Sequence, residues 1–195
     1  MFFRSLIITS DLSPIHSTRL ELRVMTPQFL QACISGDLLS ATQALGTTVP
    51  PSLLRINDIL ELRLRQLNND PDFQPWLLRA ICLRETNTMI GFIGFHTRPD
   101  PQYLHQWLRD AVEFGFEIFS AFRRQGYARE AALALMAWAH TINGVNRFVL
   151  TITPQNQPSQ ALAAKLGFKR IGSHMDVIDG LEDVLAVEYA VVTKK

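Results

Sequence analysis

The chain has little cysteine, no long apolar run and almost no net charge. Cys33 and Cys82 are the only cysteines in 195 residues, which argues against a disulfide scaffold and fits a reducing cytoplasm. No stretch approaches the roughly 20 consecutive apolar residues of a membrane-spanning helix, and the apolar start at residues 1–8 lacks the features of an export signal. A net charge of +1 gives no electrostatic case for binding nucleic acid or a membrane. We expect a cytoplasmic protein.

Several catalytic motifs are also missing. The five histidines show no H-E-x-x-H spacing and the two cysteines form no zinc-binding pair, so we predict no metal. Neither a G-x-x-x-x-G-K-[ST] phosphate loop nor a G-x-S-x-G nucleophile motif occurs. Gly91 and Gly94 do not complete a dinucleotide-binding G-x-G-x-x-G. With 47% hydrophobic and 19% charged residues, the chain is typical of a folded soluble protein, and we expect one domain.

The most informative absence lies in residues 122–130, which contain no Ser, Thr, Asp or Asn. These are the usual N-cap residues, yet a long Ala/Leu-rich helix is predicted to begin here. A helix start leaves four backbone N–H groups unpaired and carries a partial positive charge. Gly126 and Ala128 are small enough to let a ligand approach the backbone. The pattern therefore predicts an anion site, although an ordinary basic surface turn is the alternative.

The segment before this loop, residues 111–119, reads as a strand. Its aromatic and β-branched residues alternate with polar or small ones. One face carries Phe114, Phe116 and Ile118, and the other carries Glu113, Gly115 and Glu117. We interpret the phenylalanines as core residues.

A second block follows at residues 149–168, where a strand leads into a short helix that ends at Gly167. It contains Asn-x-x-Ser at 156–159 and Lys-Leu-Gly-Phe at 165–168. The two blocks together, with Arg-x-x-Gly-x-Ala at 123–128, resemble the acetyl-CoA-binding segments of the GNAT acetyltransferase superfamily. The Arg-Leu-x-Leu-Arg pattern at 19–23 and residues 179–184 resemble its ribosomal-protein N-terminal (alanine/serine) acetyltransferase branch.

The resemblance implies a GNAT-like α/β (α+β) fold. Its sheet is mixed and mostly antiparallel, of about seven strands, with helices on both faces. A single acetyltransferase domain spans residues 1–195, of which residues 1–18 form an N-terminal extension. Periodicity and turn residues place the elements. Strands are expected at 19–24, 76–83, 89–96, 111–119, 147–153, 168–176 and 184–192, and helices at 27–35, from residue 50 to 67, at 127–141 and at 156–166.

The resemblance also implies which residues bind acetyl-CoA. Backbone N–H groups of the loop would hold the pyrophosphate, with arginines adding charge. A backbone N–H at the end of the preceding strand would stabilise the thioester oxygen, and Asn156 would contact the pantetheine or cap its helix. The expected cofactor-binding residues are Ile118, Phe119, Arg123, Arg124, Gln125, Gly126, Tyr127, Ala128, Arg129, Asn156 and Ser159.

Proton transfer needs an acid and a base. Many superfamily members use a tyrosine on the second block's helix as acid, but this helix has none. By resemblance to the ribosomal branch, Ser159 takes that role, or it simply caps the helix. Glu117 is our first candidate for the base because it lies just before the loop, and His96 is the second.

The resemblance implies an N-acetyltransferase that passes the acetyl group of acetyl-CoA to a primary amine by direct attack. The acceptor is a protein N-terminus or a small-molecule amine. The alternative is an acyl-CoA-binding or regulatory protein of the same fold without efficient turnover. We expect the acceptor pocket between residues 27–67, the connection 99–109 and the last strand pair, in a monomer or homodimer.

Overall fold

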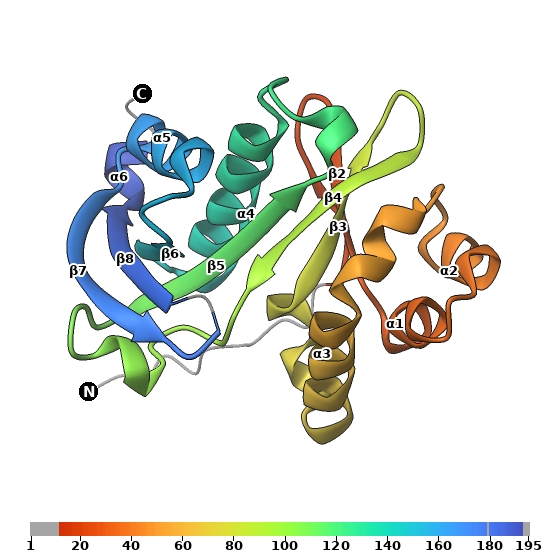
Figure 1. Ribbon diagram of the computed structural model, residues 1–195, viewed down its shortest axis with the longest axis horizontal. Helices are drawn as coiled ribbons and strands as arrows, with labels where there is room; N and C mark the ends of the chain where they lie inside the picture. The colour runs from red at the N-terminus through yellow and green to blue at the C-terminus, as the bar shows by residue number, and fades with distance from the viewer. Residues whose placement is uncertain (1–11, 179, 193–195) are drawn as a thin grey trace.

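Within the described residues, eight strands form one mixed, mostly antiparallel sheet (Figure 1). The computed structural model describes residues 12–178 and 180–192. The strand order is β1-β2-β3-β4-β5-β6-β8-β7, and β5 runs parallel to β6. The strands are β1 (Ile15–His16), β2 (Leu20–Val24), β3 (Leu78–Leu83), β4 (Thr88–Phe95), β5 (Ala111–Ile118), β6 (Arg147–Ile152), β7 (Lys169–Asp176) and β8 (Gly180–Glu188). The predicted sheet type is confirmed.

Helices cover both faces of the sheet, as expected. Figure 1 shows α1, α2 and α3 grouped on one side of the strands and α4 and α5 on the other. The α-helices are α1 (Pro27–Ile34), α2 (Leu38–Leu45), α3 (Asn57–Asn69), α4 (Tyr127–Asn143), α5 (Gln157–Leu166) and α6 (Tyr189–Val192). Short 3-10 helices are η1 (Pro51–Ile56), η2 (Pro71–Trp76), η3 (Gln102–Leu104) and η4 (Ser120–Phe122).

The first helices begin and end at recognisable residues. Thr26 caps α1 by accepting a hydrogen bond from the Phe29 N–H at 3.2 Å. The sequence analysis missed α2, whose signals are Asp37, which caps the start, and Gly46, which ends the helix at φ 68°. The single helix expected from residue 50 is instead η1 followed by α3.

Two boundaries of the sheet also differ from expectation. β1 pairs with β2 through Ile15 and Leu22, so part of the expected N-terminal extension joins the sheet. The last strand ends at Glu188 rather than continuing to residue 192. There the Tyr189 N–H bonds the Asn146 carbonyl at 2.8 Å and its ring stacks on His140, which turns the chain into α6.

Aromatic side chains fix α4 against the sheet. Phe95 of β4 and Phe114 of β5 are almost fully buried, and Trp138 of α4 packs on Phe95 with ring centroids 6.2 Å apart. Trp76 also contacts Trp138, at 5.3 Å. Each such buried ring stabilises the fold by about 1.5–3 kcal/mol relative to an exposed one. Phe114 packs on Phe95, which contacts α4, so Glu113 and Glu117 face the opposite side of the sheet.

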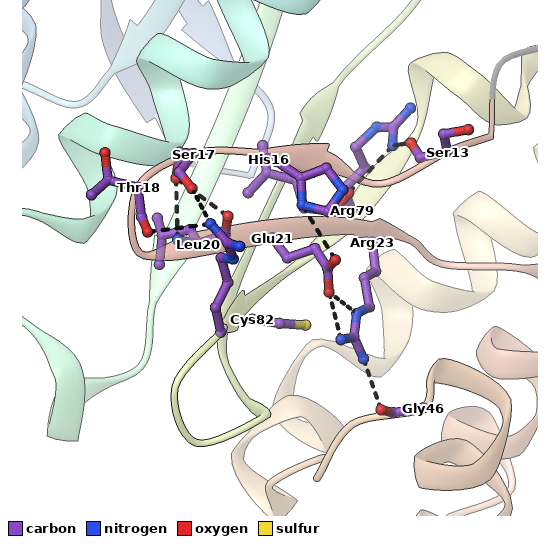
Figure 2. Close-up of polar contacts among 12 residues, drawn as sticks. Ser13, His16, Ser17, Thr18, Leu20, Glu21, Arg23, Gly46, Arg79 and Cys82 are labelled. Carbon is purple, nitrogen blue, oxygen red and sulfur yellow. Dashed lines mark hydrogen bonds and ion pairs between the residues drawn. The ribbon is translucent and has the colours of Figure 1, made fainter.

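A polar chain connects the β1–β2 hairpin to the end of α2 (Figure 2). His16 lies 3.4 Å from the Glu21 carboxylate, and Arg23 donates from Nε to Glu21 at 2.6 Å. Arg23 also donates to the Gly46 carbonyl at 2.7 Å. These contacts fix the position of β2. Residues next to β2 in turn contact the candidate site described below.

The two cysteines are buried free thiols. Burial raises the pKa of Cys33 to about 12 and that of Cys82 to about 11, so both thiols stay protonated and unreactive. No helix in the described part of the chain is both long and apolar enough to cross a bilayer.

Candidate active site

The N-terminus of α4 is open, as its sequence predicts. Gly126 precedes the helix with φ 82°, a left-handed conformation that glycine adopts without strain, and Arg124 has φ 63°. In the part of the chain that the structure describes, no side chain caps this helix. Its first N–H groups, from residue 126 to 129, therefore point out of the helix end with a partial positive charge. This arrangement can bind a phosphate or pyrophosphate.

The loop arginines divide into two groups. Arg123 turns back from the helix end: its Nε donates to the Ile118 carbonyl at 2.8 Å, and Nη2 lies 3.6 Å from Glu117. Arg124 is exposed and Arg129 lies in the first turn of α4. In this structure Arg123 thus supports the end of β5, and the charge available to an anion comes from Arg124 and Arg129.

A clamp that the sequence analysis missed holds the loop in place. The Glu130 carboxylate accepts hydrogen bonds from the Arg19 backbone N–H and Nε, both at 2.7 Å, and from the Ser17 hydroxyl at 2.8 Å. Arg19 also donates to the Gln125 carbonyl at 3.1 Å and lies over the Tyr127 ring, 4.4 Å from its centroid. Burial opposes ionisation, but these donors outweigh it and keep the pKa of Glu130 below its ordinary value. Glu130 is therefore ionised near neutral pH and fixes the start of α4 to the β1–β2 hairpin.

Strands β5 and β6 separate beside this helix end. Their parallel pairing covers only Ala111 to Glu113, whereas β5 stays paired with β4 as far as Ile118. Among the described strands, residues 114–118 of β5 have no β6 partner. The two strands therefore separate as a V whose apex is Glu113.

The open edge of β5 offers backbone groups. The N–H of Phe119 donates to the Ile90 carbonyl at 2.9 Å, so it is occupied by β4. Backbone groups alternate in direction along a strand, so Phe116 and Ile118 present theirs to the V. The expected donor to the thioester oxygen is thus Phe116 or Ile118 rather than Phe119.

On the other side of the V, Asn156 caps α5. Its Oδ1 accepts from the Ser159 N–H at 3.3 Å, which confirms the capping role expected of Asn156. Ser159 lies in the first turn and is not the N-cap, so the alternative of Ser159 as the cap is wrong. Its partly exposed hydroxyl is not needed to start the helix.

The face of β5 opposite α4 carries a polar cluster that centres on Glu113. The Glu113 carboxylate is only 4% exposed and accepts hydrogen bonds from Tyr103 at 2.6 Å and Thr151 at 2.5 Å. His96 Nδ1 lies 3.4 Å from the same carboxylate. Glu117, 34% exposed, lies on the same face nearer the helix end. The structure therefore brings both candidate bases, His96 and Glu117, to one face of β5.

Sequence analysis placed Glu113 on this face but missed its burial and its partners. Burial alone would raise the pKa of Glu113, but the hydrogen bonds and charge of His96 and the hydroxyls of Thr151 and Tyr103 hold it below its ordinary value. Burial, followed by the charge of Glu113, raises the pKa of Tyr103, so its hydroxyl stays a donor. No local signal predicts this cluster, because its members come from four separate segments.

One further group of side chains could hold a metal ion: ligand atoms of His174, Asp176 and Glu182 lie within 4.8 Å of one another. Other contacts account for these positions. His174 Nε2 lies 3.8 Å from Glu182, and Asp176 accepts from the Ile178 N–H at 2.7 Å in the β7–β8 turn. The group is a hairpin contact, and the absence of a metal remains a prediction.

Comparison with known proteins agrees with this geometry. Residues 19–169 match the model of the acetyltransferase (GNAT) domain family. The chain is 33% identical over 89 residues to the uncharacterized N-acetyltransferase YoaA of Bacillus subtilis, a match that covers 46% of each chain. The chain thus spans about half the length of the curated relatives it matches.

Solved structures share the fold. A ribosomal-protein-S5-alanine acetyltransferase from Vibrio fischeri has a TM-score of 0.59 at 13% identity, covering 90% of this chain and 96% of its own. RimL, a ribosomal L7/L12 α-N-protein acetyltransferase solved with coenzyme A, has a TM-score of 0.61 at 19% identity, covering 92% and 99%. The open helix end, the V between β5 and β6 and the match over residues 19–169 lead to one assignment: the chain belongs to the GNAT acetyltransferase family.

Proposed function

We propose that this protein transfers the acetyl group of acetyl-CoA to a primary amine. The observation that carries the proposal is the uncapped N-terminus of α4 at the mouth of the V between β5 and β6. The helix end suits the pyrophosphate, and the edge of β5 beyond Glu113, which does not pair with β6, offers backbone groups to the rest of the cofactor. RimL, which shares this fold, was solved with coenzyme A.

The donor half of the site would use mainly backbone groups. N–H groups of residues 126–129 bind the pyrophosphate, and the charges of Arg124 and Arg129 add to the attraction. The N–H of Phe116 or Ile118 stabilises the oxyanion that forms on the thioester carbonyl, an effect worth about 3 kcal/mol in comparable sites. The clamp between Arg19 and Glu130 keeps these groups preorganised.

Two proton transfers complete the reaction. His96 or Glu117 accepts a proton from the amine, and Ser159 donates to or orients the departing thiolate. The Glu117 carboxylate forms an ion pair with Arg123, whereas His96 lies beside the Glu113 carboxylate. The expected acceptor pocket lies on this face, where Arg63 of α3 donates to the His96 carbonyl at 3.3 Å.

The acceptor is either a protein N-terminus or a small-molecule amine. Two proteins of the same fold acetylate ribosomal proteins, which supports N-terminal peptides as the first substrates to test. Fold likeness alone does not assign the substrate, because unrelated acceptors occur on one fold.

The test is thiol release from acetyl-CoA in the presence of three amine classes: N-terminal peptides, polyamines and aminoglycosides. Product mass should increase by one acetyl group for one class at least, with the rate saturating in acetyl-CoA. Tight acetyl-CoA binding by calorimetry without turnover on any class would instead support the alternative, an acyl-CoA-binding protein of the same fold.

A further inference from the structure

Two arginines in the described part of the chain are buried, and they differ in what surrounds them. Arg79 is fully covered, donates to the carbonyls of Leu22 and Pro75, and lies over the Trp138 ring, 5.0 Å from its centroid. Backbone oxygens and an aromatic face thus stabilise its charge. Arg63 of α3 is 8% exposed and has fewer partners.

The hydrogen bonds of Arg63 leave one edge of its guanidinium open. Nη1 makes both bonds, to Gln66 Oε1 at 2.8 Å and to the His96 carbonyl at 3.3 Å. Within the described residues Nε is buried without a partner, and Nη2, which also has none, reaches the surface. Nε and Nη2 carry parallel N–H groups along one edge of the planar group, a spacing that fits the two oxygens of a carboxylate.

No carboxylate of the described residues pairs with this cation. The titratable side chain that lies close enough to affect it is Tyr103, and burial lowers the pKa of Arg63 below its ordinary value. A buried charge without a counter-ion is costly, because the attraction that would offset its desolvation is missing. Arg63 is therefore suited to an anion that comes from outside the chain.

This cation lies where the acceptor pocket is expected. Arg63 belongs to the helices between residues 27 and 67, and the phenol beside it belongs to the connection 99–109. Both segments are predicted to line the pocket. The N–H of His96, whose carbonyl Arg63 contacts, pairs with the Glu113 carbonyl at 3.0 Å. The guanidinium is thus near the level of the apex of the V.

The separation between this apex and the thioester limits the kind of acceptor. Phe116 and Ile118, the candidate donors to the thioester oxygen, lie three and five residues beyond Glu113 on β5. At about 3.3 Å per residue, this separation is roughly 10–16 Å. The carboxylate of a free amino acid lies beside its own amine, so it cannot reach Arg63 while the amine attacks the thioester. A peptide with an acidic side chain near its N-terminus can span the distance.

We propose that Arg63 selects protein N-termini that carry an aspartate or glutamate within the first few residues, by pairing its open Nε–Nη2 edge with that carboxylate. This inference rests on the proposed function, because the N-terminal amine is the group to be acetylated. Arg63 acts in binding and takes no part in the proton transfers. The same charge disfavours polyamines and aminoglycosides, whose charged groups are cationic.

The first experiment measures binding without turnover. Calorimetry in the presence of coenzyme A compares hexapeptides that begin with Ala and carry one Asp or one Asn at each position from 2 to 6. The Asp peptide of at least one pair should bind about 10-fold more tightly, as expected for a charge-assisted bidentate pair. Arg63→Met should bind both members of that pair with the wild-type affinity for the Asn peptide. Equal affinities within every pair for the wild type would overturn the proposal.

Two further variants separate a binding role from a structural one. Arg65→Met removes an exposed arginine of α3 that pairs with Glu61, and it should keep the preference for Asp. Arg63→Lys keeps a charge but not the two-donor edge, so it should retain only part of the preference. If Arg63→Met keeps the preference and binds both peptides more weakly by the same factor, Arg63 is structural and the proposal is wrong. If Arg63→Met does not fold, the wild-type comparison of Asp and Asn peptides decides.

Turnover of the same peptides separates this proposal from the proposed function. Thiol release from acetyl-CoA should show the same preference in kcat/KM, with kcat nearly unchanged. A preference in binding without thiol release on any amine leaves the role of Arg63 intact and counts against acetyl transfer. Acetylation of Asp and Asn peptides with equal kcat/KM leaves acetyl transfer intact and overturns the role of Arg63.

Discussion

The two halves of the candidate site are built in different ways. The proposed donor half, residues 123–130, is one continuous stretch that presents backbone N–H groups at a helix end. The proposed acceptor half joins side chains of Glu113, His96, Tyr103 and Thr151 from four segments. A backbone site depends on local conformation, whereas a side-chain site depends on how distant elements pack. Changes in the donor half should therefore alter acetyl-CoA affinity, and changes in the acceptor half should alter turnover.

The largest expected effect is on turnover. His96→Gln should lower kcat by about 100-fold or more, the usual contribution of a general base, and leave the Kd for acetyl-CoA unchanged. Steady-state kinetics and calorimetry measure the two quantities. Glu117→Gln, on the same face, is the comparison variant because Glu117 is the other candidate base. If Glu117→Gln loses the acid limb of the pH–rate profile while His96→Gln does not, Glu117 is the base.

A weaker effect is expected from the clamp under the donor loop. Glu130→Ala removes three hydrogen bonds to a carboxylate that is 18% exposed, and should lower the free energy of unfolding by about 1–2 kcal/mol. It should also weaken acetyl-CoA binding, because the loop loses its anchor. Urea unfolding and calorimetry test both effects. Glu61→Ala, which breaks an exposed helix pair with Arg65, should change neither.

Ser159→Ala should have a smaller effect. One lost hydrogen bond to the departing sulfur corresponds to about 1 kcal/mol, or roughly a fivefold lower kcat, with acetyl-CoA affinity unchanged. Asn156 should keep α5 capped in this variant, so its melting temperature should match the wild type. A wild-type rate in single-turnover measurements would leave Ser159 without a role in proton transfer.

The smallest effect concerns acid stability. The pKa of Glu113 is held below its ordinary value of 4.5, so its ionised form contributes stability above pH 4.5 that is lost as the pH falls through the depressed pKa. The unfolding free energy of Glu113→Gln should therefore depend less on pH in this range than that of the wild type. Urea titrations between about pH 3 and 6 measure the slopes, and equal slopes would show that folding does not lower the pKa of Glu113.

The same contrast explains what the sequence could predict. The open end of α4 and the cap at Asn156 were predictable, because missing or present capping residues act within one turn. The contact between Arg19 and Glu130 joins residues 111 positions apart and leaves no local pattern. Strand alternation places Glu113 on the polar face of β5, but it does not show which side chains cover that face. In the structure Tyr103 and His96 contact the Glu113 carboxylate.

Helices and strand ends were predicted incorrectly where the local sequence pattern was short or ambiguous. Helix α2 has only eight residues between Asp37 and Gly46, and its apolar residues form a brief pattern. The valines at 191 and 192 favour a strand locally, but the contact of Tyr189 with His140 ends β8 earlier. Tertiary contacts override local preference in such cases.

The central claim is that the helix end after Gly126 holds the pyrophosphate of acetyl-CoA. Calorimetric titration of Gly126→Asp with acetyl-CoA tests it most directly, because the new carboxylate lies beside the bound anion. A loss of about 2 kcal/mol corresponds to a roughly 30-fold higher Kd. Gly36→Asp is the matched control, since Gly36 also has a left-handed φ, 76°, with open space around it, but lies at the end of α1. We expect acetyl-CoA to bind Gly126→Asp more weakly than the wild type and Gly36→Asp with wild-type affinity. Equal affinity in both variants and the wild type would contradict a pyrophosphate site at this helix end.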